Sequence, residues 1–238
     1  MERDYDNKSD TTMTKDSDVE SQSSEYSEAT SDETTDSTWE KETDNLVELI
    51  LNECSEKEIL EYFEENSPFD SNYSYRKWTP LHYATVKNRT DICRLLVQNG
   101  SNVNFMSKGV PWIFKDYLEM GKSPFQISCS RAVSLDIFEL FIQNGGDVEK
   151  AWSGMIPLMY VVQEPELEGD DLYDIKEQKR KLQMILEREA NVNANDLFGK
   201  NVLHHFDLYS ENETEEEQVL EMMKSMIDCN VDTGKKDS

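Results

Sequence analysis

Basic residues are scarce in this 238-residue chain, which has 24 Lys and Arg against 50 Asp and Glu and a formal net charge of −26. Such a charge repels the phosphates of nucleic acids and anionic lipid surfaces, and it excludes both as partners. Long apolar runs are also missing, since no stretch approaches the roughly 20 residues that a membrane span requires. The charge favours a protein partner with a basic surface, or it serves solubility alone.

Cysteine is rare as well. Cys54, Cys93, Cys129 and Cys229 lie far apart, and no CxxC pair or Cys/His cluster occurs. Each falls in an apolar helical context, which is typical of a buried, reduced thiol. The start of the chain, MERDYDNKSD, is too charged for the apolar core of a signal peptide. We therefore expect a protein of the cytoplasm or the nucleus.

Catalytic motifs are absent too: the sequence holds no Gly-rich phosphate loop, GxSxG elbow or HExxH pair. Acidic pairs such as Glu64–Glu65 and Asp170–Asp171 fall on polar faces or inserts, and we interpret them as solvated side chains rather than a general acid and base. His204–His205 is too short a run for a metal site without further ligands. We expect no enzymatic activity, no metal and no cofactor.

The first 43 residues differ from the rest, with 14 Asp and Glu, 4 Lys and Arg, and almost no aliphatic side chains. Nothing there offsets the entropy lost on ordering, so residues 1–43 are expected to form a disordered acidic tail. Ser17, Thr30 and Ser37 each precede an acidic residue by three positions, which makes them candidate sites for acid-directed kinases. The alternative is a solvating tail without a specific role.

Order is expected from Asp44 onward. In 44–66, apolar residues recur at helical spacing, Asp44 is a candidate cap for the first helix, and Ser55 with Glu58 forms a capping box for a second. Near the other end, the apolar residues of 213–229 predict an amphipathic helix that closes the structure or binds through its methionines; they are Val219, Leu220, Met223, Met226 and Ile227.

Four similar phrases follow in between: KWTPLH (77–82), GKSPFQ (121–126), GMIPLM (154–159) and GKNVLH (199–204). After each comes an apolar helix ending in LLVQNGSNVN, LFIQNGGDVE, MILEREANVN or MMKSMIDCNVD. In the first unit, Thr79 is expected to cap a helix that begins at Pro80, Thr90 is expected to cap a second helix, and Gly100 ends that second helix. One such hairpin cannot bury both of its faces, so the repetition predicts a stack of hairpins.

The stretch Thr79-Pro80-Leu81-His82-Tyr83-Ala84 resembles the ankyrin signature TPLHxA. The resemblance covers residues 44–234 and implies an all-α ankyrin-repeat solenoid of about five helical hairpins with finger loops. The expected repeats are 44–76, 77–120, 121–153, 154–198 and 199–234. The resemblance further implies a monomeric scaffold that binds a protein through its fingers and the concave face of its inner helices. In such units His82 and His204 bond to backbone of the neighbouring repeat.

The spacing of the repeats is irregular. The first helical positions, 80, 124, 157 and 202, are 44, 33 and 45 residues apart, against a family period of 33. Inserts at 105–120 and 163–178 supply the excess. Long, irregular units behind a tail are similar to those of poxviral ankyrin-repeat proteins, which implies a modulator of host innate or NF-κB signalling. The alternative is a substrate-recruiting adaptor of a ubiquitin ligase, which the ending CNVDTGKKDS, without an F-box-like segment, disfavours.

Aromatic side chains gather in or beside the fingers. Trp and Tyr are enriched at binding hot spots. We therefore predict a partner-binding row made of Tyr73, Tyr75, Trp78, Phe105, Trp112, Trp152 and Phe198. As an alternative, the insert around Trp112 folds back over an edge of the core. The second insert either extends the helix that follows it or forms a separate partner-binding helix.

Overall fold

The computed structural model describes residues 33–52, 54–66, 70–74, 77–107, 121–152, 154–163, 175–206 and 213–228. The chain divides into two units, residues 1–32 and 33–238, and all described residues belong to the second. Ser17, Thr30, Tyr75, Trp112, Cys229 and most of both inserts lie outside the described residues. The predictions made for them stay predictions.

Every regular element in the described part of the chain is helical. The elements are α1 (Glu33–Leu51), α2 (Glu56–Glu65), α3 (Pro80–Val86), α4 (Thr90–Gln98), α5 (Pro124–Ser128), α6 (Leu135–Gln143), α7 (Pro157–Val162), α8 (Ile175–Leu186), the 3₁₀ helix η2 (Val202–His205) and α9 (Glu213–Asp228). None of these helices is long and apolar enough to cross a membrane.

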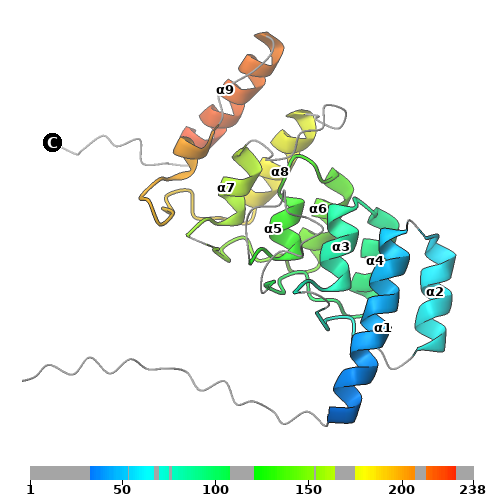
Figure 1. Cartoon of the computed structure of the whole chain (residues 1–238). Coiled ribbons are helices and arrows are strands. Elements are labelled where there is room, and N and C mark those ends of the chain that lie inside the picture. Colours follow the sequence, from blue (N-terminus) through cyan, green and yellow to red (C-terminus); the bar gives the residue numbers. More distant parts are fainter. Residues whose placement is uncertain are drawn as a thin grey trace, which may run out of the picture. The chain divides into compact units, whose positions relative to one another are not determined.

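The helices pack in two parallel rows (Figure 1). The inner row runs α1, α3, α5, α7 and η2, and the outer row runs α2, α4, α6, α8 and α9, each helix packing on the next one of its row. The pairs α1–α2, α3–α4, α5–α6 and α7–α8 also pack against each other as hairpins. This arrangement confirms the predicted solenoid, because positions 80, 124, 157 and 202 begin successive inner helices.

The starts of the inner helices follow from local chemistry. Thr79 and Ser123 precede the prolines that begin α3 and α5, and both take part in capping boxes with the residue three positions later. Ile156 precedes α7 and makes no side-chain cap. In the last unit Asn201 supplies the capping box, Val202 stands where proline stood, and the inner helix is one 3₁₀ turn. The regularity of the units therefore declines toward the C-terminal end.

The N-terminal end of the stack differs from the expectation at α1. This helix begins at Glu33, so residues 33–43, which were expected to belong to the disordered tail, are helical. Asp44 lies inside the helix, and the prediction that Asp44 caps it is wrong. Leu46, Val47 and Ile50 are fully buried. They anchor the helix against α3, and once a helix is nucleated each further residue adds a hydrogen bond at small cost. The candidate phosphorylation site Ser37 therefore lies within α1.

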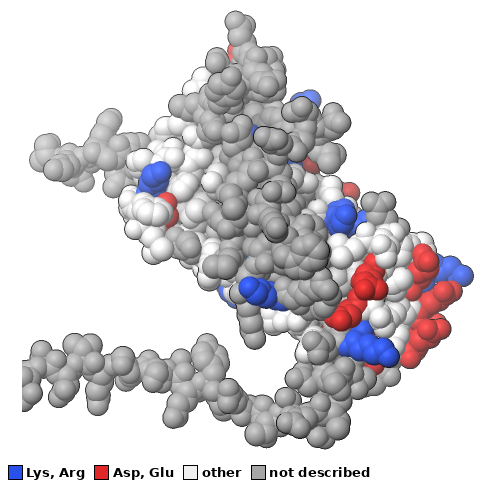
Figure 2. All heavy atoms as spheres, in the orientation of Figure 1, with Lys and Arg blue, Asp and Glu red and all other residues white. Residues whose placement is uncertain are grey.

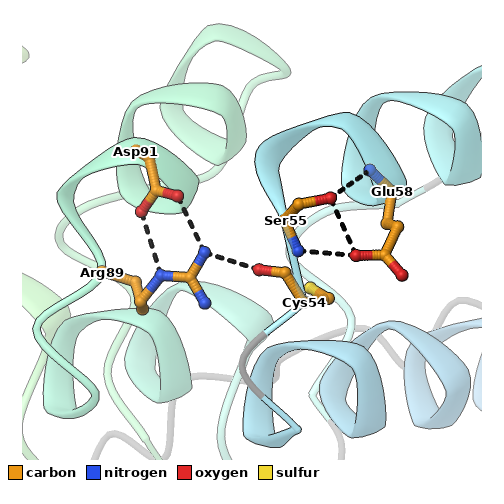
Figure 3. Close-up of polar contacts among 5 residues, drawn as sticks. All are labelled: Cys54, Ser55, Glu58, Arg89 and Asp91. Carbon is orange, nitrogen blue, oxygen red and sulfur yellow. Dashed lines mark hydrogen bonds and ion pairs between the residues drawn. The ribbon is translucent and has the colours of Figure 1, made fainter.

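The capping box predicted at α2 is confirmed (Figure 3). Ser55 Oγ accepts from Glu58 N at 3.3 Å, and Glu58 Oε2 accepts from Ser55 N at 2.7 Å. Beside it, the guanidinium of Arg89 forms a two-pronged ion pair with Asp91, and its Nη2 donates to Cys54 O at 2.7 Å. Arg89 therefore ties the start of α4 to the turn before α2. Arg89 occupies the cap position of α4 and Thr90 is the first helical residue, so the prediction that Thr90 caps this helix is wrong.

A buried lysine joins α8 to the preceding hairpin. Lys181 is 1% exposed, and its Nζ donates to the carbonyl oxygens of Ser128, Ser130 and Val133 at 3.0, 2.8 and 2.5 Å. These carbonyls belong to the end of α5 and the turn that leads to α6. An ammonium group has three N–H donors, so each of them is satisfied without water. This arrangement makes the burial of a charge tolerable.

Cys54, Cys93 and Cys129 are free and buried, as the sequence predicts. Burial raises the pKa of Cys93 and of Cys129 to about 12, although Thr85 partly opposes the rise at Cys93 and Lys181 at Cys129. Thiols with such values stay protonated near neutral pH and are poor nucleophiles. These cysteines therefore act as small apolar core residues.

Candidate functional site

Four loops project beside the inner row, each leading from the outer helix of one repeat to the inner helix of the next. We call them the first finger (70–74 with 77–79), the second finger (101–107 with 121–123), the third finger (146–152 with 154–156) and the fourth finger (190–201). Together they form the finger row. Three of the inner helices offer little surface, because every residue of α5 and α7 is buried and Val86 is the exception in α3. At the two ends of the row, α1 exposes Lys41, Asn45 and Glu48 and η2 exposes His204, so the expected contribution of inner helices to a partner surface falls on these ends.

Side-chain amides link each finger to the next. Asn72 accepts from Asn102 N at 2.7 Å and donates to Gly100 O at 3.1 Å. Asn104 repeats the pattern one finger later, accepting from Asp147 N at 2.9 Å and donating to Gly145 O at 2.7 Å. An amide has both an acceptor and donors, so one side chain satisfies two backbone groups of its neighbour. The first three fingers are thus joined by a repeated two-bond contact.

The third finger uses a carboxylate for the same purpose. Glu149 Oε1 accepts from Asn191 N at 2.6 Å, which links the third finger to the fourth. An ionised carboxylate has no donor, so this junction has only the accepting half of the contact. The fourth finger is therefore attached by one side-chain bond fewer at this position.

A second set of contacts runs from the inner helices to the fingers. His82 Nδ1 accepts from Thr79 N at 3.1 Å, and its Nε2 donates to Lys122 O in the second finger at 3.2 Å. Burial lowers the pKa of His82 to about 3, against the opposing effect of its backbone hydrogen bonds, so the ring is neutral at pH 7. This confirms the structural role expected for His82. His204 differs: it is exposed and bonds within its own turn, to Asn201.

Gln126 does in the second repeat what His82 does in the first. Its Oε1 accepts from Ser123 N at 2.9 Å, and its Nε2 donates to Lys150 O in the third finger at 2.6 Å. Met159 occupies the same position in the third repeat and has no group able to bridge in this way. The side-chain contacts between fingers and the contacts from an inner helix to the next finger are therefore both weaker between the third and fourth fingers.

The aromatic side chains of the row divide by burial. Trp78 is 2% exposed, its indole stacks on the His82 ring at a centroid distance of 5.7 Å, and its edge meets Tyr83. No ring surface of Trp78 remains for a partner, so it does not belong to a binding surface. Phe105 and Tyr73 are half-buried, and Phe105 packs edge-on against His82. A hydrophobic residue in a finger can therefore belong to the core.

Trp152 has a partly structural role as well. A Cβ atom on Gly121 would lie 2.5 Å from atoms of the Trp152 indole, so the ring covers the backbone of Gly121 directly. Trp152 also exchanges two backbone hydrogen bonds with Met155, at 2.8 and 2.9 Å. The half-buried indole thus ties the third finger to the second, and only its remaining edge faces solvent.

Phe198 is 87% exposed, and Leu197 beside it is 74% exposed. Among the described residues they are the most exposed of the large apolar side chains. Sequence reasoning identified Phe198 but not Leu197. The signal that was overlooked is the stretch Asp196-Leu197-Phe198-Gly199, in which a turn-forming pair flanks two apolar residues.

The turn that carries this pair is held by Asp196. Its Oδ1 accepts from Phe198 N at 2.8 Å and from Lys200 N at 2.9 Å, and its backbone N–H donates to Lys200 O at 2.9 Å. Burial by itself raises the pKa of the Asp196 carboxyl, but these hydrogen bonds and nearby His205 hold the pKa below its usual range. Gly199 adopts the positive φ of +73° that closes the turn.

Two further contacts, from His205 and from Gly154, hold the turn in place. His205 Nε2 lies 3.1 Å from Asp196 Oδ2, and burial lowers the pKa of His205 despite the opposing effect of that carboxylate. A Cβ on Gly154 would lie 2.7 Å from Leu197 N and 2.8 Å from Asp196 Cα. The backbone of the fourth finger therefore rests directly on that of the third.

Comparisons with known proteins agree with this architecture. A family profile described as ankyrin repeats, in three copies, matches residues 41–107. Over 101 residues, or 42% of this chain, the sequence is 28% identical to an ankyrin repeat protein, OPG189, of Vaccinia virus (strain Copenhagen). Identity over the same length is 27% to the protein of that name from Monkeypox virus and 26% to that of Variola virus. The matched stretch spans 16% of the length of these relatives.

Residues 41–107 therefore match ankyrin repeats, a fold that serves protein–protein interaction and is generally not enzymatic. In the residues that the structure describes, no three His, Cys, Asp or Glu side chains cluster in a way that could hold a metal ion. The finger row is the part of the described surface with the most regular construction, and it is the candidate site of interaction.

Proposed function

We propose that this chain, whose ankyrin repeats are an interaction fold, is a non-enzymatic scaffold that grips a protein partner with its finger row. The observation that supports this most is the linkage of the fingers through Asn72, Asn104 and Glu149. Loops linked in this way present one continuous surface and lose little conformational entropy on binding. The titratable groups His82 and Asp196 are committed to holding the fingers, which leaves them unsuited to acid–base chemistry.

The charge of the chain supports a basic partner surface. The net charge of −26 attracts basic proteins over long distances and speeds their association. Figure 2 shows acidic side chains gathered where α2 lies, and the exposed acids of that helix are Glu56, Glu58, Glu61, Glu64 and Glu65. We expect association with the partner to slow as salt concentration rises.

We further propose that the chain acts as a monomer in the cytoplasm or nucleus of an infected cell, where it modulates host innate or NF-κB signalling. The similarity to ankyrin repeat proteins of poxviruses supports the viral setting of this proposal. The alternative role, recruitment of a substrate to a ubiquitin ligase, predicts a different set of bound proteins. Both roles use the same finger row and differ in the proteins that are bound, so identification of the bound proteins distinguishes them.

The test is affinity capture with the full chain as bait in extracts of host cells, followed by binding of each captured protein in purified form. We expect a direct one-to-one complex with a protein of the signalling machinery. Capture of cullin-type ligase components would favour the adaptor role. A synthetic peptide of residues 1–32, added as competitor, must leave the complex intact; displacement by the peptide, or the absence of any direct binder, would refute the proposal.

A further inference from the structure

We infer that Leu197 and Phe198 form an apolar anchor that inserts into an uncharged pocket on the partner protein. We call this pair with its turn, 196–200, the fourth-finger tip. The inference rests on the proposed function and specifies its contact. Two adjacent large apolar side chains exposed by 74% and 87% are costly in water, and an apolar site on a convex loop gains most from a concave apolar site.

The turn of the fourth-finger tip is held by its own contacts, although the finger as a whole has fewer bonds to its neighbour than the other fingers have. The Asp196 carboxylate holds Phe198 N and Lys200 N, and the finger backbone lies against Gly154 with no room for a methyl group between them. A loop that is already ordered has little entropy left to lose on binding. An accidental exposure of apolar residues on a loose loop would lack these supports.

The charges around the tip indicate the chemistry of the pocket. Residues 190–201 contain one acid and one base, in a chain of net charge −26. The acid, Asp196, is buried in the turn, and the base is Lys200. The other exposed polar side chains of the finger include the neutral amides of Asn191, Asn193 and Asn195. An apolar pocket with an uncharged, hydrogen-bonding rim complements this surface, whereas a cluster of basic residues would find no exposed carboxylate in this finger.

The neighbouring third finger has two exposed acids, and each of them holds a backbone group of the fingers. Glu149 Oε1 accepts from Asn191 N, and Asp147 Oδ1 accepts from Glu149 N. Long-range attraction by the net charge and close contact by the tip are therefore separate steps: the first acts on the association rate and the second on the dissociation rate.

A second copy of this chain is a poor occupant for the tip. Two convex tips that face each other would bury only the two apolar side chains of each copy. The area of such a contact is far smaller than the roughly 800 Å² per partner of a stable interface. Two chains of net charge −26 also repel each other. The partner is therefore a different folded protein, with a concave apolar site.

The test compares three full-chain variants against the partner identified by affinity capture, using surface plasmon resonance. L197S/F198S should raise the dissociation rate at least tenfold and leave the melting temperature unchanged. Leu60→Ser, which alters an apolar residue of α2 that is 42% exposed, is the matched control and should leave the dissociation rate unchanged. Lys200→Ala should alter the dissociation rate less than twofold. Raising the salt concentration from 50 to 300 mM should slow association of all variants and leave their dissociation rates alone.

The outcomes separate the two proposals. If the wild-type chain captures no direct binder, the proposed function fails. If it captures one and L197S/F198S dissociates at the wild-type rate, only this inference fails. Benzoylphenylalanine placed at position 198 should cross-link to an apolar pocket of the partner. Cross-linking to a basic patch, or to a second copy of this chain, would overturn the assignment.

A partner-free measurement uses β-cyclodextrin, a soluble apolar cavity with a rim of neutral hydroxyls. Titration at millimolar concentration should shift the NMR signals of the Phe198 ring and the Leu197 methyl groups before those of other apolar residues. The L197S/F198S variant should show no shift at the fourth-finger tip. Unchanged signals of both side chains in the wild-type protein would show that the tip is closed to a neutral cavity, against the inference.

Discussion

The backbone N–H of Asn191 donates to Glu149 Oε1 across 2.6 Å, which joins the third finger to the fourth. At the two preceding junctions, asparagine side chains accept the corresponding hydrogen bond. The carboxylate accepts, but unlike an amide it has nothing to donate. This junction also carries Met159 where His82 and Gln126 bridge the earlier ones. The attachment of the fourth finger therefore depends on fewer bonds, and a substitution at this junction should affect mainly the fourth finger.

We expect Glu149→Ala to lower the free energy of unfolding by about 1 kcal/mol, the usual net contribution of a hydrogen bond. Hydrogen exchange of the Asn191 amide should accelerate at the same time. Glu149→Gln is the matched control, because its Oε1 accepts the same hydrogen bond and its amino group adds a donor. Equal exchange rates at Asn191 in wild type and Glu149→Ala would contradict the assigned contact.

His82 should make the stability of the repeats depend on pH. Its pKa is about 3 in the folded protein against 6.5 for a free histidine. Between these pH values the unfolded chain binds a proton at His82 and the folded chain does not. The stabilisation is present above pH 6.5 and is lost as pH falls toward 3, at about 1.4 kcal/mol per pH unit. Urea unfolding at pH 7, 6, 5 and 4 measures this loss.

The control for this prediction is His82→Gln, since Gln126 makes the equivalent contacts in the next repeat without a titratable group. The stability of His82→Gln should fall less steeply between pH 6.5 and 4. Parallel curves for the two proteins would mean that His82 is accessible to protons in the folded state.

Removing the buried ammonium should be costly. Lys181→Met leaves the carbonyls of Ser128, Ser130 and Val133 without their donor, and we expect a loss of about 2–3 kcal/mol in unfolding free energy. Lys179→Met, two residues earlier in the same helix, removes an ion pair with Glu221 at the surface and should cost much less than Lys181→Met. Similar losses in both variants, measured by chemical denaturation, would argue against the special role of Lys181.

The same lysine predicts a second pH effect at the alkaline end. Burial lowers its pKa to about 8 from 10.5, an effect that Cys129 and Glu177 partly oppose. Between these values the unfolded chain holds a proton that the folded chain has lost, so the contribution of Lys181 to the free energy of unfolding should rise with pH from 8 to 10.5. Cys93 and Cys129 act in the opposite direction above pH 9, so the effect of Lys181 is read as the difference between wild type and Lys181→Met. Lys181→Met should lack this rise when unfolding is measured across the same range.

Gly154 and Gly145 form a matched pair for the packing of the fourth finger. Both have positive φ, +78° and +84°, so alanine at either position costs about 1–2 kcal/mol of backbone strain. A Cβ at Gly145 meets nothing within 4 Å, whereas one at Gly154 would meet Leu197 N at 2.7 Å. Gly154→Ala should therefore destabilise the protein more and shift the NMR signals of residues 196–200. Equal effects of the two variants would show that the fingers do not touch there.

The repeated phrases in the sequence were enough to predict the succession of hairpins. Helix starts depend on a few local groups, and the Thr79–His82 and Ser123–Gln126 boxes act within four residues of chain. The start of α1 was missed because its first two turns lack an apolar stripe, and their order comes from continuity with the buried residues Leu46 and Ile50.

The finger aromatics show where sequence reasoning stops. Trp78 and Phe198 both lie just outside a helix in a polar loop, and both looked available to a partner. One is 2% exposed and the other 87%. The difference arises from His82 and Tyr83, against which Trp78 packs, while the Asp196 turn directs Phe198 to solvent. Burial of a side chain depends on which surface lies opposite, and spacing along one chain does not contain that information.

By itself, then, the sequence determined the kind of fold, the order of the repeats, the capping boxes at Ser55 and Thr79, and the charge of the chain, because each of these is a local or additive property of the residues. Only the tertiary structure decided that Glu149 bonds to Asn191, that Lys181 lies among three carbonyls, and that Leu197 and Phe198 are exposed. Each of these facts joins residues about 40 to 50 positions apart or depends on the absence of a neighbour. Such contacts arise when the hairpins stack, since stacking brings distant backbone groups within hydrogen-bonding distance.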